Sequence, residues 1–437
     1  MRTSPLPPPP DRSTSAPHST KIDFSLQVLG LSGQPHLFGD SPVICFMAHP
    51  LTPPNLLPTS GPRALVIGAG VSGLTTARCL QQRGFAVTVI ADRFQSATTS
   101  VVAGALWEWP PAVCGYYELQ PEESLRAEQR WCVESYNCFK VLAQQPSTGV
   151  YLRPVIFYLE TPAEENPLEL RKMRELREHV GGFLHSAELA SRPGINPTSA
   201  FVDAYTYETP LVDTDIYLAW LLSEILGHGG AIEHARVEAP LVASAPQLRD
   251  TYRADVIVNC TGLGARDLAD DDVIPVRGAW LLVENDGQRF PKITTAHCSS
   301  LTDSASGGGF LFIVPRGRDR LILGGIAHPE RWTTELGSER ASILESIRER
   351  CTEFMPCLAR AEISEHSEIR VGLRPFRRAG VRVESEGGIA VVHNYGHGGS
   401  GVTLSWGSAG DAALLASEAV MGADRQSGRS LVGSANG

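Results

Sequence analysis

A cluster of glycines near the end of the chain offers backbone N–H groups to a ligand. An apolar run at residues 389–392 leads into the cluster at Gly396, and a run compatible with a helix leaves it after Gly401. Glycine lets the backbone approach a flat ligand closely, and the first N–H groups of a helix have no partner within that helix. Such a helix start favours negative charge. The sequence therefore predicts a binding site for a flat, electron-rich group here.

A second glycine motif lies within residues 63–92, where a strand-like run, a glycine turn, a helical run and another strand-like run follow one another. In this pattern Gly68 makes the tight turn, Gly70 lets a pyrophosphate approach, and Gly73 packs the helix on the strand. Asp92, at the end of the second run, is placed to accept a hydrogen bond from an adenosine ribose. The motif predicts a Rossmann-type dinucleotide site and by itself leaves NAD and FAD open.

The run from His393 to Thr403 resembles the signature of the D-amino acid oxidase family, which includes D-aspartate oxidase. Residues 91–107 and 254–262 match the same family in the same order, and the resemblance extends from about residue 62 to about 422. It implies FAD, because a reduced flavin carries negative charge that the helix start would stabilise. No His or Cys lies in a recognisable flavin-attachment motif, so FAD is expected to bind non-covalently. The expected cofactor-binding residues are Gly68, Ala69, Gly70, Val71, Ser72, Gly73, Asp92, Arg93, Thr98, Thr99, Ser100, Gly104, Ala105, Leu106, Thr261, Gly262, Arg374, His393, Gly398, Gly399, Ser400, Gly401, Val402 and Thr403.

The same resemblance implies that Arg374 binds the α-carboxylate of a substrate. A guanidinium keeps its charge and matches a carboxylate with two parallel donors, although a surface arginine beside Arg377 is the alternative. Family members place a tyrosine hydroxyl near this arginine, but Phe312 occupies the matching strand, and the lid region at 300–309 is rich in Ser and Gly. Loss of that hydroxyl is expected to weaken substrate binding by about 1–3 kcal/mol. The expected catalytic residues are Arg374, Phe312 and Gly399.

The chemistry that the resemblance implies is transfer of a hydride from the substrate Cα to flavin N5, with no side chain acting as a base. Alignment over the ring then carries most of the catalysis. His393 and His397 are interpreted first as structural hydrogen-bonding groups, although either could touch the flavin. An acidic substrate needs a second cation near the lid, for which Lys292 and His297 are the nearest candidates. A neutral or uncommon substrate is therefore preferred over D-aspartate.

Composition narrows the class of protein. The chain has 38 basic and 48 acidic residues, which argues against a nucleic-acid or anionic-membrane partner. No apolar stretch approaches the roughly 20 residues that span a bilayer. The nine cysteines have no metal-ligand or CxxC spacing, so no metal site is predicted, and a reduced compartment is the simplest inference. With no signal peptide and no C-terminal peroxisomal tripeptide, the cytoplasm is the expected location, although residues 1–60 could instead be an organelle presequence.

The predicted fold is α/β, with a Rossmann-type FAD-binding domain assembled from discontinuous segments and an α+β substrate domain whose sheet is mixed or antiparallel. The resemblance implies that this second sheet covers the flavin. The expected division is a Pro/Ser-rich, disordered extension at 1–60, an FAD-binding domain at 61–115, 235–275 and 365–425, a substrate domain at 116–234 and 276–364, and a flexible tail at 426–437. The expected elements include strands at 150–159, 276–283, 310–314 and 321–325 and helices at 121–142, 164–179 and 213–226, the last with Asp213 as N-cap.

Three functions remain open on the sequence. The leading one is an FAD-dependent oxidase that converts a D-amino acid into a 2-oxo acid, ammonia and hydrogen peroxide, with molecular oxygen as the electron acceptor. The second is a flavin-dependent oxidase or dehydrogenase of another amine (glycine, a cyclic amino acid or a carrier-bound amino acid), which the missing tyrosine favours. The third is a catalytically silent flavoprotein, against which the retained Arg374 argues. A homodimer is a possible assembly.

Overall fold

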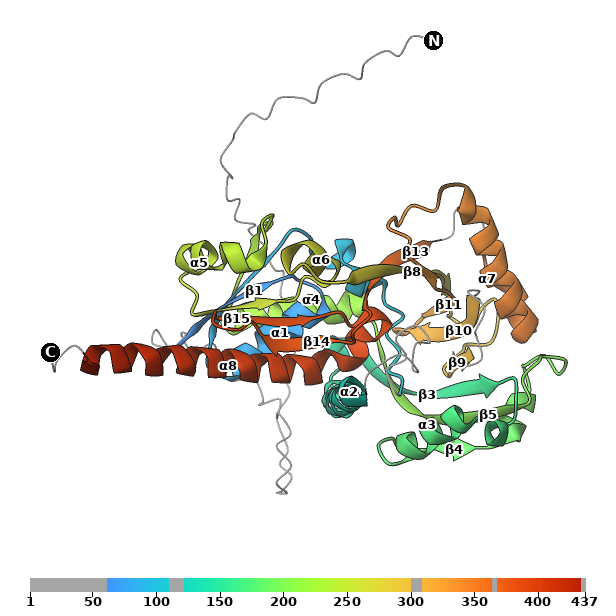
Figure 1. Ribbon diagram of the computed structural model, residues 1–437. Helices are drawn as coiled ribbons and strands as arrows, with labels where there is room; N and C mark the ends of the chain where they lie inside the picture. The colour runs from blue at the N-terminus through green and yellow to red at the C-terminus, as the bar shows by residue number, and fades with distance from the viewer. Residues whose placement is uncertain (1–60, 110–121, 300–308, 364–367, 434–437) are drawn as a thin grey trace, which may run out of the picture.

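Two β-sheets lie side by side in the computed structural model, which describes residues 61–109, 122–299, 309–363 and 368–433 (Figure 1). The expected extension at 1–60 and residues 300–308 of the expected lid lie outside this described part. One sheet has six strands and the other has nine. The predicted α/β fold, with a Rossmann-type sheet and a second mixed sheet, is confirmed by this arrangement.

The first sheet has the strand order β14-β15-β7-β1-β2-β6. All of its pairs are parallel except β14 with β15, so the carboxyl ends of β1, β2 and β7 meet at one edge, where such sheets bind ligands. The strands are β1 (Arg63–Ile67), β2 (Ala86–Ala91), β6 (Ala231–His234), β7 (Val256–Asn259), β14 (Arg382–Ser385) and β15 (Val391–Tyr395).

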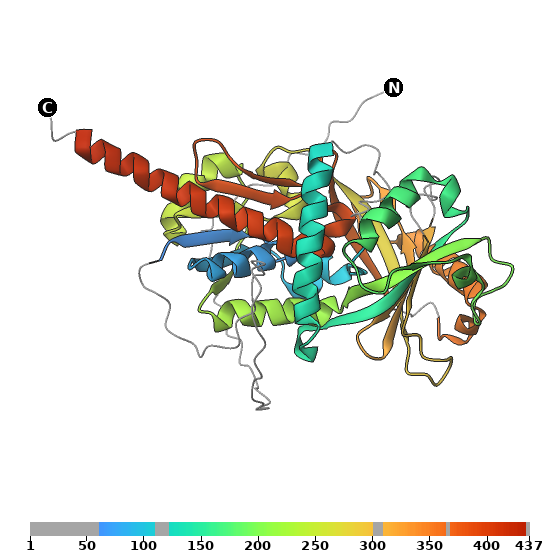
Figure 2. The same cartoon turned by 90° about the horizontal axis from the view of Figure 1, so that it is seen from below.

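Alternating residues of β1 bury on opposite faces of this sheet, which explains its two helical layers. Ala64 and Val66 join the core beneath α1, whereas Leu65 and Ile67 join the core beneath α5. α4 and α8 pack against α1, and α2 crosses α8 (Figure 2). No helix of the described residues is both long and apolar enough to cross a membrane. The helices are α1 (Val71–Gln82), α2 (Glu122–Leu142), α3 (Pro167–Arg177), α4 (Thr214–Gly227), α5 (Leu241–Tyr252), α6 (Ala265–Leu268), α7 (Arg340–Phe354) and α8 (Gly401–Gly433).

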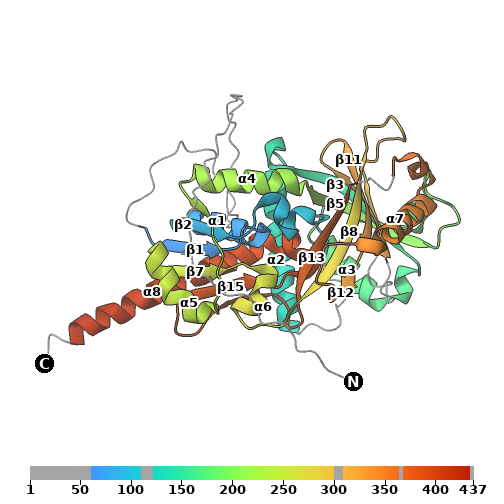
Figure 3. The ribbon, with the colours of Figure 1, turned by 90° about the horizontal axis from the view of Figure 1, so that it is seen from above.

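The second sheet has the order β12-β8-β11-β10-β9-β3-β5-β4, with β13 also paired to β8. Its pairs are antiparallel except β3 with β9. β8 and β13 are its strands nearest the first sheet (Figure 3). The strands are β3 (Val150–Leu159), β4 (Leu184–His185), β5 (Asp203–Val212), β8 (Val273–Glu284), β9 (Ala296–Ser299), β10 (Gly309–Arg316), β11 (Arg320–Ile326), β12 (His328–Pro329) and β13 (Ile369–Arg377).

The structure departs from the expected division of the chain at three points, two in the sheets and one in α8. β6 lies within the segment 116–234 but pairs with β2 of the first sheet, and β13 lies within 365–425 but pairs with β8 of the second. Strand pairing joins distant segments, so composition along the chain does not reveal it. α8 also continues to Gly433, past the expected start of the tail at 426, because no proline interrupts it.

Candidate active site

One cavity of about 1540 Å³ opens between the two sheets. Its walls come from the carboxyl ends of β1, β2 and β7 and from β8, β10 and β13. It therefore brings together segments as distant in sequence as Ile67 and Val402. The expected site residues that line it are Gly68, Ala69, Gly70, Val71, Ser72, Asp92, Arg93, Thr98, Thr99, Ser100, Gly104, Ala105, Leu106, Thr261, Gly262, Phe312, Arg374, Gly398, Gly399, Gly401 and Val402.

Glycines are required where the first turn approaches its neighbours. Gly68 has a φ of +113°, and a Cβ there would lie 2.4 Å from the carbonyl oxygen of Cys260. A Cβ on Gly73 would lie 1.9 Å from the carbonyl oxygen of Gly68, so Gly73 packs the helix against the turn and does not line the cavity. Gly70 precedes α1 and faces the cavity without a side chain. The turn thus has the close packing that a pyrophosphate-binding loop needs.

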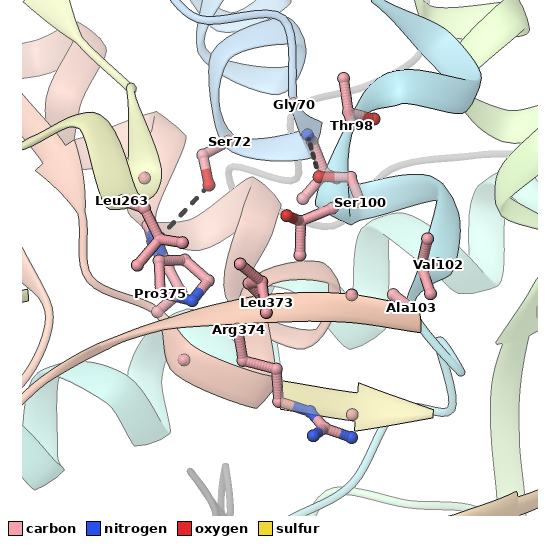
Figure 4. A pocket seen from close by; sticks show the side chains of 18 of the residues that line it. Gly70, Ser72, Thr98, Ser100, Val102, Ala103, Leu263, Leu373, Arg374 and Pro375 are labelled. Atoms are coloured by element: carbon pink, nitrogen blue, oxygen red, sulfur yellow. Dashed lines mark hydrogen bonds between the residues drawn. The ribbon is translucent and has the colours of Figure 1, made fainter. Parts of the chain in front are cut away.

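Two helices begin at the cavity wall. The N–H of Val71, in the first turn of α1, donates to Ser100 Oγ at 2.9 Å. Ser72 Oγ lies 3.4 Å from His397 Nδ1, which connects the start of α1 to the segment before α8. Figure 4 shows Ser72 and Ser100 near the glycine turn, with Leu373 and Arg374 across the cavity from them. Both helix starts favour anionic groups, as phosphates and a reduced flavin would be.

The two histidines of the signature have different surroundings. His397 lines the cavity wall, and burial lowers the pKa of its imidazole to about 4, so it is neutral at physiological pH. Its Nε2 lies 3.1 Å from Ser408 Oγ. His393 instead contacts Glu386 at 2.9 Å and Asn259 at 3.3 Å and does not line the cavity.

Ser400 and Thr403 also lie outside the cavity lining. Both are buried, and the N–H of Ser400 donates to the carbonyl of His397 in a short 3-10 turn that precedes α8. The structure thus brings most of the expected residues to one cavity, but places His393, Ser400, Thr403 and Gly73 behind its wall.

Arg374 projects from β13 at the other side of the cavity. Its Nη1 donates to the carbonyl of Ile326 at 3.2 Å, which orients the guanidinium. A Cβ on Gly278 of β8 would lie 2.3 Å from that Nη1, so glycine is what gives the guanidinium room. Phe312 of β10 packs its ring over Gly104, where a Cβ would lie 2.6 Å from Cε1. A fixed cation and an aromatic ring therefore face the glycine-rich wall.

Lys292 and His297, the expected candidates for a second cation, do not line the cavity. Lys292 is exposed and forms an ion pair with Asp319 at 2.6 Å. His297 is buried beside Tyr158, with 2.8 Å between Nδ1 and the hydroxyl oxygen. Burial lowers the pKa of His297 to about 4, so it carries no charge near neutral pH. Neither residue can balance an acidic side chain in the cavity.

Arg316, on the strand that carries Phe312, holds the loop that the cofactor phosphates are expected to contact. Its Nη1 donates to the carbonyl of Val212 at 2.8 Å and to that of Ala103 at 3.3 Å, and its Nη2 to that of Val101 at 3.3 Å. Burial lowers the pKa of Arg316 to about 10, while nearby aspartates favour its charge. This buried cation fixes the position of the loop relative to the second sheet.

Several cavity residues were not predicted. Residues 235–238 line the cavity directly after β6, and the rule that ligands meet the carboxyl ends of parallel strands would have found them had β6 been assigned to the first sheet. Glu108 and Trp332 also line it. No local motif marks either residue. Within the described residues, no group of His, Cys, Asp and Glu side chains could hold a metal ion.

The residues present fit a flavin dinucleotide. The glycine turn, the start of α1 and Asp92 at the end of β2 lie in the order that a pyrophosphate and an adenosine ribose require. The start of α8 supplies a second group of N–H donors on the same wall, at the level of Gly399. The cavity continues from there to Arg374 and Phe312, which leaves room for a substrate between the ring and the second sheet.

Known proteins resemble this chain over most of its length. The family described as FAD dependent oxidoreductase matches residues 63–415. A D-amino-acid oxidase of Rubrobacter xylanophilus is 39% identical over 363 residues, covering 82% of this chain and 97% of the relative. A D-amino-acid oxidase of Streptomyces coelicolor is 37% identical, covering 81% and 96%. A D-aspartate oxidase of Homo sapiens is 31% identical, covering 82% and 95%.

Solved structures agree on the fold. The glycine oxidase of Bacillus cereus has a TM-score of 0.62 at 17% identity, covering 82% of this chain and 97% of that one. The glycine oxidase of Geobacillus kaustophilus has a TM-score of 0.63 at 16% identity, covering 82% and 95%. At this identity the likeness shows the fold alone, whereas the family match and the closer relatives decide the family. The chain belongs to the FAD dependent oxidoreductase family that the D-amino acid oxidase signature predicted, and FAD is its cofactor.

Proposed function

We propose that this protein is an FAD-dependent oxidase that deaminates a D-amino acid to a 2-oxo acid. The imino acid formed first is hydrolysed to the 2-oxo acid and ammonia, and molecular oxygen takes up the two electrons to give hydrogen peroxide. The observation that carries the proposal is Arg374, a cation whose Nη1 is oriented by Ile326 in the same cavity as the glycines at the start of α8. The D-amino-acid oxidase relatives support it.

The chain's own residues hold the two reactants in register. Val71 and Ser72 at the start of α1 would hold the phosphates of FAD, Asp92 would hold its ribose, and Gly399 would hold its flavin. Bound FAD supplies the capacity to accept two electrons from the substrate. Arg374 fixes the substrate carboxylate with parallel donors and thereby aligns the Cα with the ring.

Phe312 offers no hydroxyl to the carboxylate, so Arg374 carries more of the binding than in a site with a tyrosine. We expect a weaker substrate affinity, by about 1–3 kcal/mol, and an unimpaired chemical step. The absent hydroxyl is also what favours the second candidate, a flavin-dependent oxidase or dehydrogenase of another amine such as glycine, a cyclic amino acid or a carrier-bound amino acid. We place the enzyme in the cytoplasm and leave a homodimer as its possible assembly.

An anaerobic absorbance titration tests the function. The purified holoenzyme is titrated with D-amino acids, with their L-enantiomers and with glycine, and R374A is titrated in parallel. Bleaching of the flavin band by D-enantiomers alone, with a much higher half-saturation concentration in R374A, is expected. Bleaching by glycine or a cyclic amino acid alone would support the second candidate, and a bound flavin that none of these compounds bleaches would contradict the proposed oxidation of a D-amino acid. Admitting oxygen then separates an oxidase, which recovers its colour, from a dehydrogenase.

A further inference from the structure

Glu108 brings a buried charge cluster to the wall of the cavity. Lys172 Nζ lies 3.0 Å from Glu108 Oε1 and 3.8 Å from Glu169 Oε1. The side chain of Glu108 is 19% exposed, whereas those of Lys172 and Glu169 are 6% and 0% exposed. Of the three, only Glu108 lines the cavity. The cluster therefore meets a ligand through a carboxylate.

Pairing with β5 places Glu108 at this wall. The N–H of Trp107 donates to the carbonyl of Pro210 at 3.0 Å, and Ala105 accepts from the N–H of Val212 at 2.9 Å, so the chain runs beside β5 before it reaches Glu108. Lys172 comes from α3 on the other side. Its Nζ lies 4.9 Å from the centre of the Phe157 ring and 5.9 Å from that of Tyr205, which holds the ammonium in place beneath Glu108.

Lys172 and Glu108 form a charged pair at the cavity wall. Burial lowers the pKa of Lys172, but Glu169 and Glu108 raise it more, so Lys172 remains an ammonium. Burial raises the pKa of the Glu108 carboxyl, and Lys172 opposes that rise. The Lys172 ammonium lies 3.0 Å from Glu108 and 3.8 Å from Glu169, and of these two carboxyl groups only Glu108 reaches the cavity. A buried negative charge of this kind is stabilised by a second cation and made less favourable by another anion.

The position of Glu108 relative to Arg374 assigns the cluster to the side-chain end of the substrate. Arg374 is on β13, Phe312 is on β10, and Glu108 follows a segment beside β5, in the order in which those strands cross the sheet. All three line the same cavity. Phe312 packs over Gly104, and from there the chain runs beside β5 to Glu108, so a substrate whose carboxylate is bound by Arg374 can extend its side chain past Phe312 toward Glu108.

We propose that Glu108, held by Lys172, selects D-amino acids whose long side chain ends in a cation, as in lysine or arginine, and disfavours acidic ones. The proposal rests on the proposed function, because it takes Arg374 as the carboxylate ligand. A cationic end group would pair with the Glu108 carboxylate at the cavity wall, whereas a carboxylate in the same place would meet a group of like charge. A non-acidic substrate is expected from the sequence, and the Glu108 carboxylate narrows this expectation to D-amino acids with a cationic side chain.

The test compares wild type with E108Q and with E178Q. Glutamine keeps the shape of Glu108, and Lys172 stays beside Glu169, so E108Q is expected to fold. Glu178 ends α3 on the exposed surface and does not line the cavity, so E178Q removes the same charge as a matched control. The substrates are D-arginine against D-citrulline, which has nearly the same shape without the charge, and D-glutamate against D-glutamine.

In wild type and E178Q, kcat/KM for D-arginine should exceed that for D-citrulline, and E108Q should reduce this ratio by about tenfold to a hundredfold, as expected for a hydrogen bond to a charged group. E108Q should also narrow the preference for D-glutamine over D-glutamate. The proposal would be overturned if the ratio of kcat/KM for D-arginine to that for D-citrulline were the same in E108Q as in wild type. It would also be overturned if wild type preferred D-citrulline over D-arginine, or D-glutamate over D-glutamine.

Oxidation of D-citrulline and D-glutamine separates this outcome from failure of the proposed function. If the neutral substrates are oxidised but Glu108 has no effect on selectivity, the inference about Glu108 is wrong and the function stands. If none of the D-amino acids bleaches the flavin, the proposed function itself fails. Should E108Q not retain FAD, the order of the four substrates in wild type and in E108D, which keeps the charge, decides the question.

Discussion

Replacing Gly278 with alanine tests the role of Arg374 without changing Arg374. Gly278 lies on β8 opposite Gly372 of β13, two residues from Arg374 along that strand. A Cβ on Gly278 would lie 2.3 Å from Arg374 Nη1 and 2.5 Å from both Cζ and Nη2, whereas ordinary van der Waals contact begins at 3.4 Å. The guanidinium must therefore retreat by about 1 Å, a misplacement large enough to affect a positioned reactant.

This displacement of the guanidinium should weaken substrate binding and leave stability and FAD affinity almost unchanged. The displacement of the guanidinium strains or breaks the 3.2 Å hydrogen bond from Nη1 to the carbonyl of Ile326. It also moves the two parallel N–H donors of Arg374 away from the substrate carboxylate. Loss of a hydrogen bond to a charged group costs about 1.5–3 kcal/mol, so KM should rise about tenfold to a hundredfold. Gly278 is not among the glycines with a positive φ, and the clash is with the end of a flexible side chain. The melting temperature and FAD affinity should therefore change little.

Steady-state kinetics with the best D-amino acid gives kcat and KM, and flavin fluorescence gives the FAD dissociation constant. Gly410→Ala is the matched control, because a Cβ at this position of α8 has no atom within 4 Å. The expected result is a raised KM in Gly278→Ala alone. An unchanged KM in a Gly278→Ala enzyme that retains FAD would show that the position of the Arg374 guanidinium does not govern substrate binding, and would refute the reasoning.

Three further predictions address the cofactor, stability and pH. In Gly73→Ala the new Cβ would lie 1.9 Å from the Gly68 carbonyl oxygen, so the turn must open and the FAD dissociation constant, measured by fluorescence titration, should rise at least about tenfold. Arg316→Met leaves Asp213, which lies 3.4 Å from Nε, without this cation and should lower the free energy of unfolding in urea by about 3–5 kcal/mol; a loss below about 1 kcal/mol would contradict a structural role for this cation. Burial lowers the pKa of His397 from 6.5 to about 4, so the unfolded chain binds the proton first, and stability should fall as pH drops from 6.5 to 4. In His397→Asn, the melting temperature should fall less between pH 6.5 and pH 4 than in wild type. An identical pH dependence of the melting temperature in the two proteins would contradict this assignment to His397.

The local parts of the fold were predictable because their signals are local. The strand, turn, helix and strand of the first motif were expected at 63–92 and are found as β1, α1 and β2, ending at Ala91. The glycine spacing determines the turn, and periodicity determines the elements on either side. The same holds for β3, which runs from Val150 to Leu159 as expected.

Interactions between distant residues were not predictable in this way. Asp213 precedes α4 as expected, but its side chain makes no cap hydrogen bond and instead lies 3.4 Å from Arg316 Nε, 103 positions away. Glu108 and Lys172 are 64 positions apart and meet only because β5 and α3 bring them together. His393 was expected at the cofactor, yet Glu386 on the connection from β14 draws it behind the wall. Each of these contacts depends on packing between elements, which no single-segment pattern encodes.

The cavity is a joint product of both sheets, and this has a thermodynamic consequence. Arg316 of β10 and Trp280 of β8 both donate to backbone carbonyls of the loop at 101–103, Trp280 Nε1 to Val102 at 2.7 Å. The loop that lines the cofactor side of the cavity is therefore held by the sheet that lines the substrate side. A ligand that binds only the folded chain stabilises it by about 2.7 kcal/mol at 100 times its dissociation constant. Because the loop connects the two sheets, FAD should slow amide hydrogen exchange in β8 and β10 as well as in β1 and α1.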